Sequence, residues 1–522
     1  MLSSLGENLV YRPRELRFGT SGRRGRVIDL TQLEIYINVL AELEFLQSLT
    51  PADGGIRRGA EFCFARDLRP SSAEICLAAE QAIRDAGMIP VNMGVIPTPA
   101  LMYYALSRAI GSIMVTGSHI PFDLNGYKLN RSTGEMLKEH EAPIGESSDR
   151  VRARLYAQPF SESPFDEHGR FRDGHGELGP EHGVARLAYL DRYRKFFQGL
   201  SLSGYGILVY QHSAVGRDLL VEILESFGAE VVAAGRSDTF VAIDTEAIDA
   251  AQLAAIQALA DRAGRLDAVV STDGDSDRPL ILGVESGRVQ FFSGDLVGMV
   301  VAEYLGADAV VVPISCNDAI DRGALAPVLG PKTRIGSPHV VAGMAAACRK
   351  GGETVCGWEA NGGFLLGSDI ERNGRTLTAL PTRDAFLPIL TVLFAARAKR
   401  VSLAALFAEL PKRYSRAALV RNFSRESGKR IVEILSARKP AQLEEFFTPA
   451  SGFSVIAGVD LTDGLRIFFT NGDIAHFRPS GNADEFRVYA VADTQERADR
   501  IIEAGIAEPC GIVRAMERVL IA

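Results

Sequence analysis

The hydrophobic pattern of the N-terminal region alternates between helical and strand spacing. Apolar residues recur three or four positions apart from Leu33 to Leu46, and Thr31 with Glu34 fits a capping box, which predicts a helix there. A second helix is predicted to end at Ala86. Short apolar runs predict buried strands at 62–64, 91–95 and 112–115. This alternation is typical of an α/β domain with a mainly parallel sheet.

Residues 141–185 interrupt this alternation. They are rich in glycine, proline, histidine and charged residues, which predicts a long surface excursion before a helix near 185–197. Two further units then repeat the strand-and-helix pattern, beginning with buried-strand sequences at 206–210 and 309–313. The C-terminal region shows short strand patterns followed by a helix around Ile501, which is typical of an α+β domain.

The length of 522 residues exceeds what one hydrophobic core supports, so several domains are expected. We predict an α/β protein with three successive α/β domains, each with a mixed, mainly parallel sheet, and a C-terminal α+β domain. The predicted domains are 1–200, 201–308, 309–415 and 416–522. The similar size of the first three units suggests an internal triplication.

Charge and cysteine spacing exclude several classes of function. The net charge of -8 argues against general binding of nucleic acid or anionic membranes. No two of the six cysteines have CxxC spacing, so neither zinc nor a redox dithiol is indicated. The N-terminus lacks the pattern of a signal peptide, and the apolar run 386–396 is too short to span a bilayer. We therefore expect a cytoplasmic protein.

Three carboxylates at alternate positions, Asp273, Asp275 and Asp277, form a distinctive chemical pattern. In a tight loop they would repel one another, and a hard divalent cation resolves that repulsion. An EF-hand loop would need glycine and glutamate where Arg278 and Val284 stand. An enzyme with an aspartyl-phosphate intermediate and a solvated acidic turn are the remaining alternatives.

Ser118 follows a predicted strand in a loop bounded by Gly117 and Pro121, which suits a hydroxyl that must approach a phosphate. A serine-hydrolase elbow would need glycine where the chain has Ile120. The alternative is an ordinary turn serine. Lys128 is suited to clamp a phosphate by charge, or to act as a base if its pKa is lowered, although an isolated lysine is usually a surface residue.

Three further loops combine glycine with charged or polar side chains. The segments 18–26 and 478–482 contain arginines and hydroxyls among glycines, and Arg487 is close to the second, so both are suited to cradle phosphate. Plain turns are the alternatives. The segment 357–363 offers a carboxylate and an amide suited to sugar hydroxyls, or is a turn beside a buried tryptophan.

Taken together and in this order, these stretches resemble the α-D-phosphohexomutase family, the phosphoglucomutases and phosphomannomutases. The resemblance spans nearly the whole chain. Phe-Gly-Thr-Ser-Gly-x-Arg-Gly is intact at 18–25, and Asp-Gly-Asp-x-Asp-Arg is intact at 273–278. The family's Thr-Ala-Ser-His-Asn-Pro appears as Thr-Gly-Ser-His-Ile-Pro at 116–121, and Asn-Gly-Tyr-Lys follows at 125–128.

The resemblance implies a mutase that interconverts hexose 1-phosphate and hexose 6-phosphate through a phosphoserine and a hexose 1,6-bisphosphate. It also implies a Mg²⁺ cofactor and four domains around a central cleft. The implied metal ligands are oxygens of Ser118, Asp273, Asp275 and Asp277. Besides Ser118, the residues implied in proton transfer and phosphate support are His119, Lys128, Arg24 and Arg278. Those implied in substrate binding are Glu359, Asn361, Arg478, Ser480, Gly481, Asn482 and Arg487.

The chain departs from the family pattern mainly on its recognition loops. Asn361 stands where serine is usual, Gly362 and Gly363 replace Gly-His, and the serine loop carries Gly117 and Ile120 for Ala and Asn. Mannose phosphate is the expected substrate, with glucose phosphate or both sugars as the alternative. A phosphosugar-binding protein without turnover and a phosphatase are the rival classes. The expected partner is a small phosphosugar, and the expected state is a monomer or small homo-oligomer.

Overall fold

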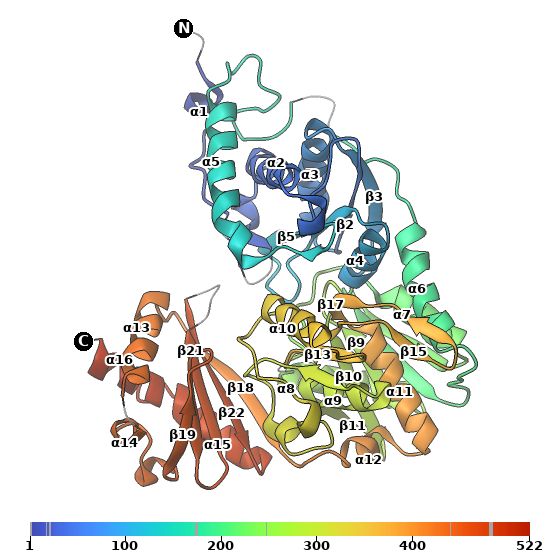
Figure 1. The fold of residues 1–522 in the computed structure, drawn as a ribbon, viewed down its shortest axis with the longest axis vertical. Coiled ribbons are helices and arrows are strands. Elements are labelled where there is room, and N and C mark those ends of the chain that lie inside the picture. Colours follow the sequence, from blue (N-terminus) through green and yellow to red (C-terminus); the bar gives the residue numbers. More distant parts are fainter. Residues whose placement is uncertain are drawn as a thin grey trace.

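The chain folds into four successive units, shown in sequence colours in Figure 1, in a computed structural model. The structure describes residues 3–16, 18–19, 22–172, 176–246, 248–438, 440–479 and 484–521. The N-terminal unit lies at the top of the view, the second and third lie together below it, and the C-terminal unit stands to one side. Three α/β units followed by an α+β unit match the predicted fold class.

The N-terminal unit is built on a six-stranded mixed sheet in the order β1-β5-β4-β2-β3, with β6 paired to β5. Its strands are β1 (Arg23–Arg26), β2 (Glu61–Arg66), β3 (Ile89–Val95), β4 (Gly111–Val115), β5 (Leu124–Arg131) and β6 (Gly134–Glu135). Its helices are α1 (Leu5–Asn8), α2 (Gln32–Ser48), α3 (Ser72–Asp85), α4 (Thr98–Ser107) and α5 (Glu141–Tyr156). Thr31 caps α2 as predicted, because its hydroxyl accepts a hydrogen bond from the Glu34 amide.

The second unit contains a five-stranded sheet in the order β11-β10-β9-β7-β8. The helix α6 (Val184–Phe196), predicted near 185–197, leads into it from the first unit. The strands are β7 (Gly206–His212), β8 (Glu230–Arg236), β9 (Ala268–Thr272), β10 (Pro279–Glu285) and β11 (Arg288–Phe292). The helices between them are α7 (Arg217–Ser226) and α8 (Ala250–Arg262).

The third unit contains a four-stranded sheet in the order β12-β13-β14-β17 and a two-stranded ribbon of β15 and β16. The strands are β12 (Ala309–Val311), β13 (Val355–Trp358), β14 (Phe364–Leu366), β15 (Ile370–Arg372), β16 (Arg375–Leu377) and β17 (Leu380–Asp384). The helices are α9 (Gly294–Leu305), α10 (Ser337–Arg349), α11 (Phe386–Lys399) and α12 (Leu403–Phe407).

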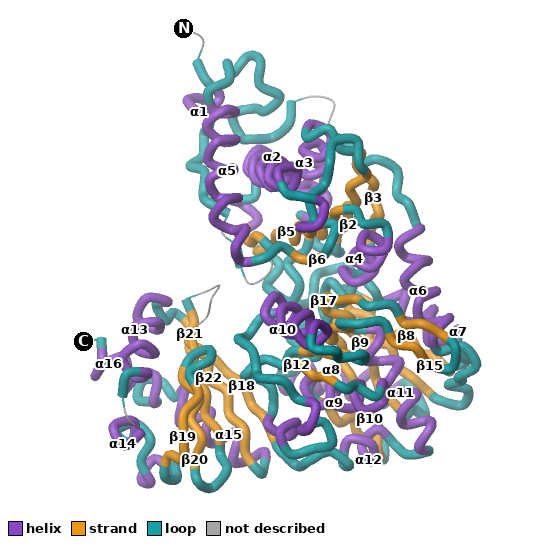
Figure 2. Tube along the Cα trace, viewed as in Figure 1, coloured by secondary structure: helices purple, strands orange, loops and turns teal. Residues whose placement is uncertain are grey.

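The C-terminal unit is a five-stranded antiparallel sheet in the order β18-β22-β21-β20-β19, seen as a separate group of strands in Figure 2. The strands are β18 (Tyr414–Arg421), β19 (Ile456–Asp460), β20 (Leu465–Phe469), β21 (Ile474–Pro479) and β22 (Glu485–Ala492). The helices are α13 (Arg425–Ser436), α14 (Pro440–Leu443), α15 (Gln495–Ile506) and α16 (Ile512–Leu520). The helix predicted around Ile501 is α15, and its Ile501 and Ile502 are buried in this unit's core.

Two features differ from the sequence-based expectation. The sheets are mixed, but among the described strands parallel pairing does not dominate, because each of the first three sheets continues into antiparallel pairs such as β4 with β5 and β9 with β10. The segment 141–185 is also not wholly a surface excursion, since α5 occupies its beginning. Pro143 stands in the first turn, where its missing N–H breaks no helical hydrogen bond, and Ile144, Val151 and Leu155 form a buried stripe.

A continuous hydrophobic core joins the first three units. It includes Cys63 of β2, Val209 of β7 and Phe364 of β14, whereas the C-terminal unit has a separate core. Because packed interiors deform little, the loops that these three units extend toward one another are held in a fixed relation. Within the described part of the chain, no helix combines the length and apolar character needed to cross a membrane.

Candidate active site

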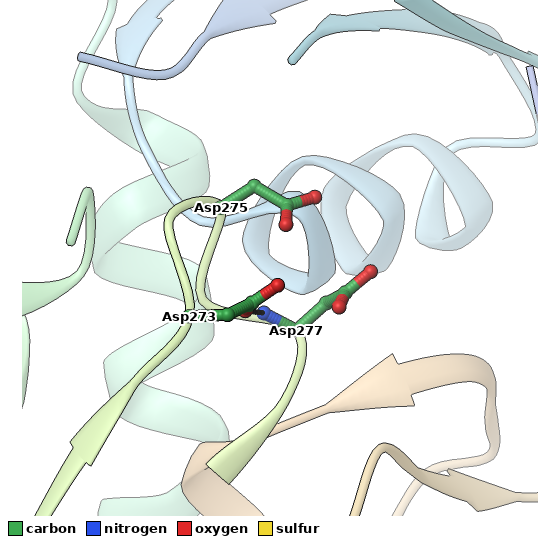
Figure 3. Close-up of side chains that lie close together, drawn as sticks. All are labelled: Asp273, Asp275 and Asp277. Carbon is green, nitrogen blue, oxygen red and sulfur yellow. Dashed lines mark hydrogen bonds between the residues drawn. The ribbon is translucent and has the colours of Figure 1, made fainter. Parts of the chain in front are cut away.

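The acidic loop 273–278 connects the antiparallel strands β9 and β10, so its flanks are strands and not the helices of an EF-hand. One carboxylate oxygen from each of Asp273, Asp275 and Asp277 lies within 4.8 Å of the others, and all three side chains are buried. Figure 3 shows the three side chains leaving one turn of the chain with their carboxylates close together. The structure therefore brings the predicted metal-binding residues together.

Two basic residues offset the charge of this acidic triad. Lys128 Nζ donates hydrogen bonds to Asp275 Oδ2 at 2.7 Å and to Asp277 Oδ2 at 2.9 Å. Arg383 Nε donates to Asp277 Oδ2 at 3.1 Å. Burial and the adjacent carboxylates raise the pKa of Asp273. Burial acts in the same direction on Asp275 and Asp277, but Lys128 and Arg383 outweigh it, and the pKa of each falls.

The donor set of the triad fits a hard divalent cation. The Oδ1 atoms of Asp275 and Asp277 are buried and accept no hydrogen bond from the residues that the structure describes. A buried carboxylate oxygen without a partner is costly, and such oxygens are the ligands that Mg²⁺ prefers. Asp277 Oδ1 lies 3.6 Å from Arg278 Nε, an ion pair beyond hydrogen-bond distance, so both Oδ1 atoms are suited to a bound Mg²⁺.

Ser118 lies in the loop that follows β4 and faces the acidic triad from the first unit. Its Oγ donates a hydrogen bond to Asp273 Oδ2 at 2.7 Å, and its side chain is buried. Its φ of +54° is in the left-handed region, which is uncommon for a residue with a side chain. A Cβ added to Gly274 would lie 2.7 Å from the Ser118 carbonyl oxygen, so only glycine permits this close approach of the two loops.

The two predicted proton-transfer residues lie beside Ser118 and the triad. Lys128 is on β5, opposite Met114 of β4, and is buried. Burial alone would lower the pKa of Lys128, but Asp275 and Asp277 outweigh it and raise the pKa, so its ammonium stays charged. This favours the charge-clamp interpretation over a resting base.

His119 is in the opposite electrostatic situation. Its Nδ1 lies 3.5 Å from Ser118 Oγ. Burial and the guanidinium groups of Arg278, Arg24 and Arg487 lower the pKa of His119 well below its usual range. The imidazole is therefore neutral near pH 7 and has a nitrogen able to accept a proton.

Three arginines from different units converge near His119. Burial and the proximity of Arg278 lower the pKa of Arg24, on β1, to about 10. The Nε groups of Arg278 and Arg487 are buried and find no hydrogen-bond acceptor within the described residues. Guanidinium groups crowded in this way favour a bound anion, and phosphate matches their geometry.

The predicted sugar loop follows β13 and lies on the other side of Arg383. Glu359 Oε2 accepts a hydrogen bond from Arg383 Nη1 at 3.0 Å. Asn361 Oδ1 accepts one from the Gly363 amide at 3.0 Å, so part of the amide group shapes its own loop. A Cβ on Gly363 would lie 2.5 Å from Arg383 Cδ. The arginine stem thus fills the space that a side chain at position 363 would need.

The predicted phosphate loop is described only at its ends. Arg478 of β21 and Arg487 of β22 are directly opposite each other in the antiparallel pair, so their side chains share one face of the sheet. Arg478 Nε donates to Asp463 Oδ1 at 3.1 Å. Ser480, Gly481 and Asn482 lie outside the described residues.

Two residues of the site were not predicted from the sequence. Arg383, at the end of β17, bridges Asp277 and Glu359, and Thr98, at the start of α4, donates its hydroxyl hydrogen to Asp275 Oδ2 at 2.6 Å. Arg383 had no clear signal in the sequence, because its strand, Leu380–Asp384, reads Leu-Pro-Thr-Arg-Asp and lacks an apolar strand pattern. Thr98 gave no signal beyond a helix start.

Comparison with known proteins gives matches along most of the chain. Models described as phosphoglucomutase/phosphomannomutase alpha/beta/alpha domains I, II and III match residues 15–154, 188–285 and 293–414. Phosphomannomutases of Sinorhizobium fredii and Salmonella muenchen are each 38% identical to the chain over 94% of its length, covering 98% and 94% of those proteins.

A solved structure shows the same fold at low identity. Aspergillus fumigatus N-acetylphosphoglucosamine mutase, in complex with GlcNAc-6P and magnesium, superposes with a TM-score of 0.60 at 15% identity and covers 98% of each chain. The order of the three matched domains, the loops that each brings to the site and the identity over nearly the full length lead to one conclusion. The chain belongs to the phosphoglucomutase/phosphomannomutase family, the α-D-phosphohexomutases.

Proposed function

We propose that this protein is a phosphohexomutase that interconverts mannose 1-phosphate and mannose 6-phosphate, with glucose phosphates as the alternative substrates. The observation that carries the proposal is the 2.7 Å hydrogen bond from Ser118 Oγ to Asp273 Oδ2. It joins a hydroxyl from the first domain to an acidic triad from the second, which is the pairing needed for phosphoryl transfer through a phosphoserine. The two relatives at 38% identity, both phosphomannomutases, support mannose phosphate.

In this proposal Ser118 Oγ carries a phosphoryl group and transfers it to the free hydroxyl of a hexose monophosphate. The resulting 1,6-bisphosphate turns over between the domains and returns its other phosphate to Ser118. Oxygens of Ser118, Asp273, Asp275 and Asp277 would hold Mg²⁺, which supplies charge neutralisation at the phosphoryl group when bound.

Proton transfer and phosphate support fall to the residues around Ser118. The neutral imidazole of His119 accepts the proton of the attacking hydroxyl and later returns one to Ser118 Oγ. The charged Lys128 stabilises the transferring oxygens electrostatically or donates a proton to the departing one. Arg24 and Arg278 hold the phosphoryl oxygens.

Substrate recognition falls to the third and fourth domains. Glu359 accepts hydrogen bonds from sugar hydroxyls, and the Asn361 amide group adds a donor to the same loop. The phosphate group that does not react is bound by residues of the fourth domain: Arg478, Ser480, Gly481, Asn482 and Arg487. The proposed partner is thus a small phosphosugar, and not a nucleic acid or a membrane.

A mutase assay tests this function. The protein is incubated with Mg²⁺, a trace of hexose 1,6-bisphosphate and either mannose 1-phosphate or glucose 1-phosphate. Formation of the 6-phosphate establishes the reaction, and the higher kcat/KM identifies the preferred sugar. Release of inorganic phosphate would instead indicate a phosphatase. Binding of the sugar phosphate without turnover, by folded protein, would indicate a binding role.

Replacing Arg383 by Gln is expected to lower kcat/KM for the hexose phosphate roughly 10- to 100-fold, raising KM because Glu359 loses a charged hydrogen bond and lowering kcat because Asp277 loses one as well. Steady-state kinetics measure the effect. Arg372→Gln, at an exposed position of β15, is the matched control. An unchanged KM would show that Arg383 does not orient the sugar loop.

A further inference from the structure

Arg69, between β2 and α3, is the most enclosed arginine side chain near the proposed nucleophile. It is 1% exposed. Its guanidinium donates hydrogen bonds of 2.6–3.0 Å to four backbone carbonyls of the loop that carries the proposed nucleophile, those of Ser118, Ile120, Pro121 and Leu124. Four carbonyl oxygens bonded to one guanidinium hold the path of the loop, because a change in that path would break several of these hydrogen bonds together.

Asp67 connects the same arginine to the backbone of Ser118. Its Oδ2 lies 3.3 Å from Arg69 Nε and accepts a hydrogen bond from Thr116 Oγ1 at 2.8 Å. Thr116 Oγ1 in turn accepts the Ser118 amide hydrogen at 2.7 Å. The Ser118 carbonyl and amide are thus both held, directly or through one hydroxyl, by the Asp67–Arg69 pair. A left-handed φ at a serine is disfavoured and persists only where its surroundings impose it.

The second domain covers the remaining face of the guanidinium. The ring of Phe240, which follows β8, has its centroid 3.8 Å from Arg69 Cζ, a cation–π contact. On the loop side, a Cβ at Gly117 would lie 2.6 Å from Arg69 Cζ. The guanidinium therefore has no room to shift toward the loop, and Phe240 packs against it from the second domain.

We propose that Arg69 is a positioning residue that holds the loop of Ser118 so that Ser118 Oγ points toward the acidic triad. The proposal rests on the phosphohexomutase function proposed above. Arg69 donates to the loop's carbonyls and does not contact Ser118 Oγ, so it acts through the backbone. Loss of these hydrogen bonds lets the loop leave the left-handed conformation, and the hydroxyl then spends little time directed at the phosphoryl group.

The test compares Arg69→Met, Arg69→Lys and the wild type in two measurements. Hydrogen–deuterium exchange needs no substrate, so it separates a failure of this proposal from a failure of the proposed function. In Arg69→Met we expect exchange over 116–124 to rise about tenfold or more while α3 keeps its protection. In the mutase assay we expect kcat to fall about 100-fold with KM nearly unchanged. For Arg69→Lys we expect an exchange rate and a kcat between those of the wild type and of Arg69→Met, because an ammonium has three donors in a different geometry.

Two further variants complete the test. Arg84→Met removes an exposed guanidinium from α3 and should leave exchange and kcat unchanged. Phe240→Leu removes the aromatic cover from Arg69, and also a ring edge that lies beside Gly274, while leaving the guanidinium in place. A smaller rise in exchange over 116–124 is expected, and this variant serves if Arg69→Met does not fold. Unchanged exchange over 116–124 in both Arg69→Lys and Phe240→Leu overturns the proposal. Exchange that rises equally throughout the first domain overturns it as well, because it would show a general loss of stability.

Discussion

The Ser118→Ala protein is expected to lose mutase activity by roughly 10⁴-fold or more, because the substitution removes the hydroxyl that is proposed to carry the phosphoryl group through a covalent intermediate. The hydroxyl is the one atom removed, and it makes a 2.7 Å hydrogen bond to Asp273 Oδ2. The backbone of the loop is held by other groups, so the fold should survive.

Two measurements check this result. The mutase assay gives the loss of kcat, and intact-protein mass spectrometry after incubation with hexose 1,6-bisphosphate shows whether a phosphoryl group is taken up. The matched control is Ser107→Ala, at an exposed position on α4, which should behave like the wild type. Ser118→Ala protein that retains activity, or that still gains a phosphoryl group stoichiometrically, would exclude Ser118 as the nucleophile.

Asp275→Asn is expected to have the second largest effect. The substitution keeps the size of the side chain but removes one negative charge from the proposed cation site and from the ion pair with Lys128. We expect Mg²⁺ affinity to fall about 100-fold or more and kcat to fall about 10³-fold at saturating substrate. The Thr98 hydroxyl can still donate to the amide oxygen, so the loop itself should be preserved.

Isothermal titration with Mg²⁺ measures the affinity without any turnover. Asp261→Asn, at an exposed position on α8, removes the same charge away from the site and is the control. If Asp275→Asn binds Mg²⁺ as tightly as the wild type does, the triad is not the cation site. If affinity falls but kcat recovers fully at high Mg²⁺, Asp275 contributes to binding of the ion and not to the chemistry.

The sequence predicted those parts of the molecule in which neighbouring residues determine the structure. The carboxylates of the acidic triad are only two positions apart along the chain, so any tight loop brings them together. The helix α2 and its Thr31 cap followed from local spacing as well. The helix at 141–156 was missed because its buried apolar stripe is short. It consists of Ile144, Val151 and Leu155 and is interrupted by many charged residues, and Pro143 precedes it.

The features of the site and of the sheets that depend on long-range contacts could not be predicted from the sequence. Arg383 reaches Asp277 across 106 positions of the chain, and Arg69 reaches the Ser118 carbonyl across 49. In the sequence, Arg383 and Arg69 both look like ordinary surface residues, because their burial depends on partners that distant parts of the chain supply. The antiparallel ends of the sheets were missed for a related reason, because strand direction is decided by connections and not by the strands' own composition.

The hydrogen bond between Ser118 and Asp273 spans 155 positions, and the serine comes first. At translation rates of roughly 5–20 residues per second, Ser118 is synthesised about 8–30 seconds before Asp273. During that interval the nascent chain displays a hydroxyl with no carboxylate opposite it, and a fragment that ends early stays in that condition. Reactivity toward phosphosugars therefore arises only when synthesis has passed the second domain, so abandoned translation products should be catalytically silent.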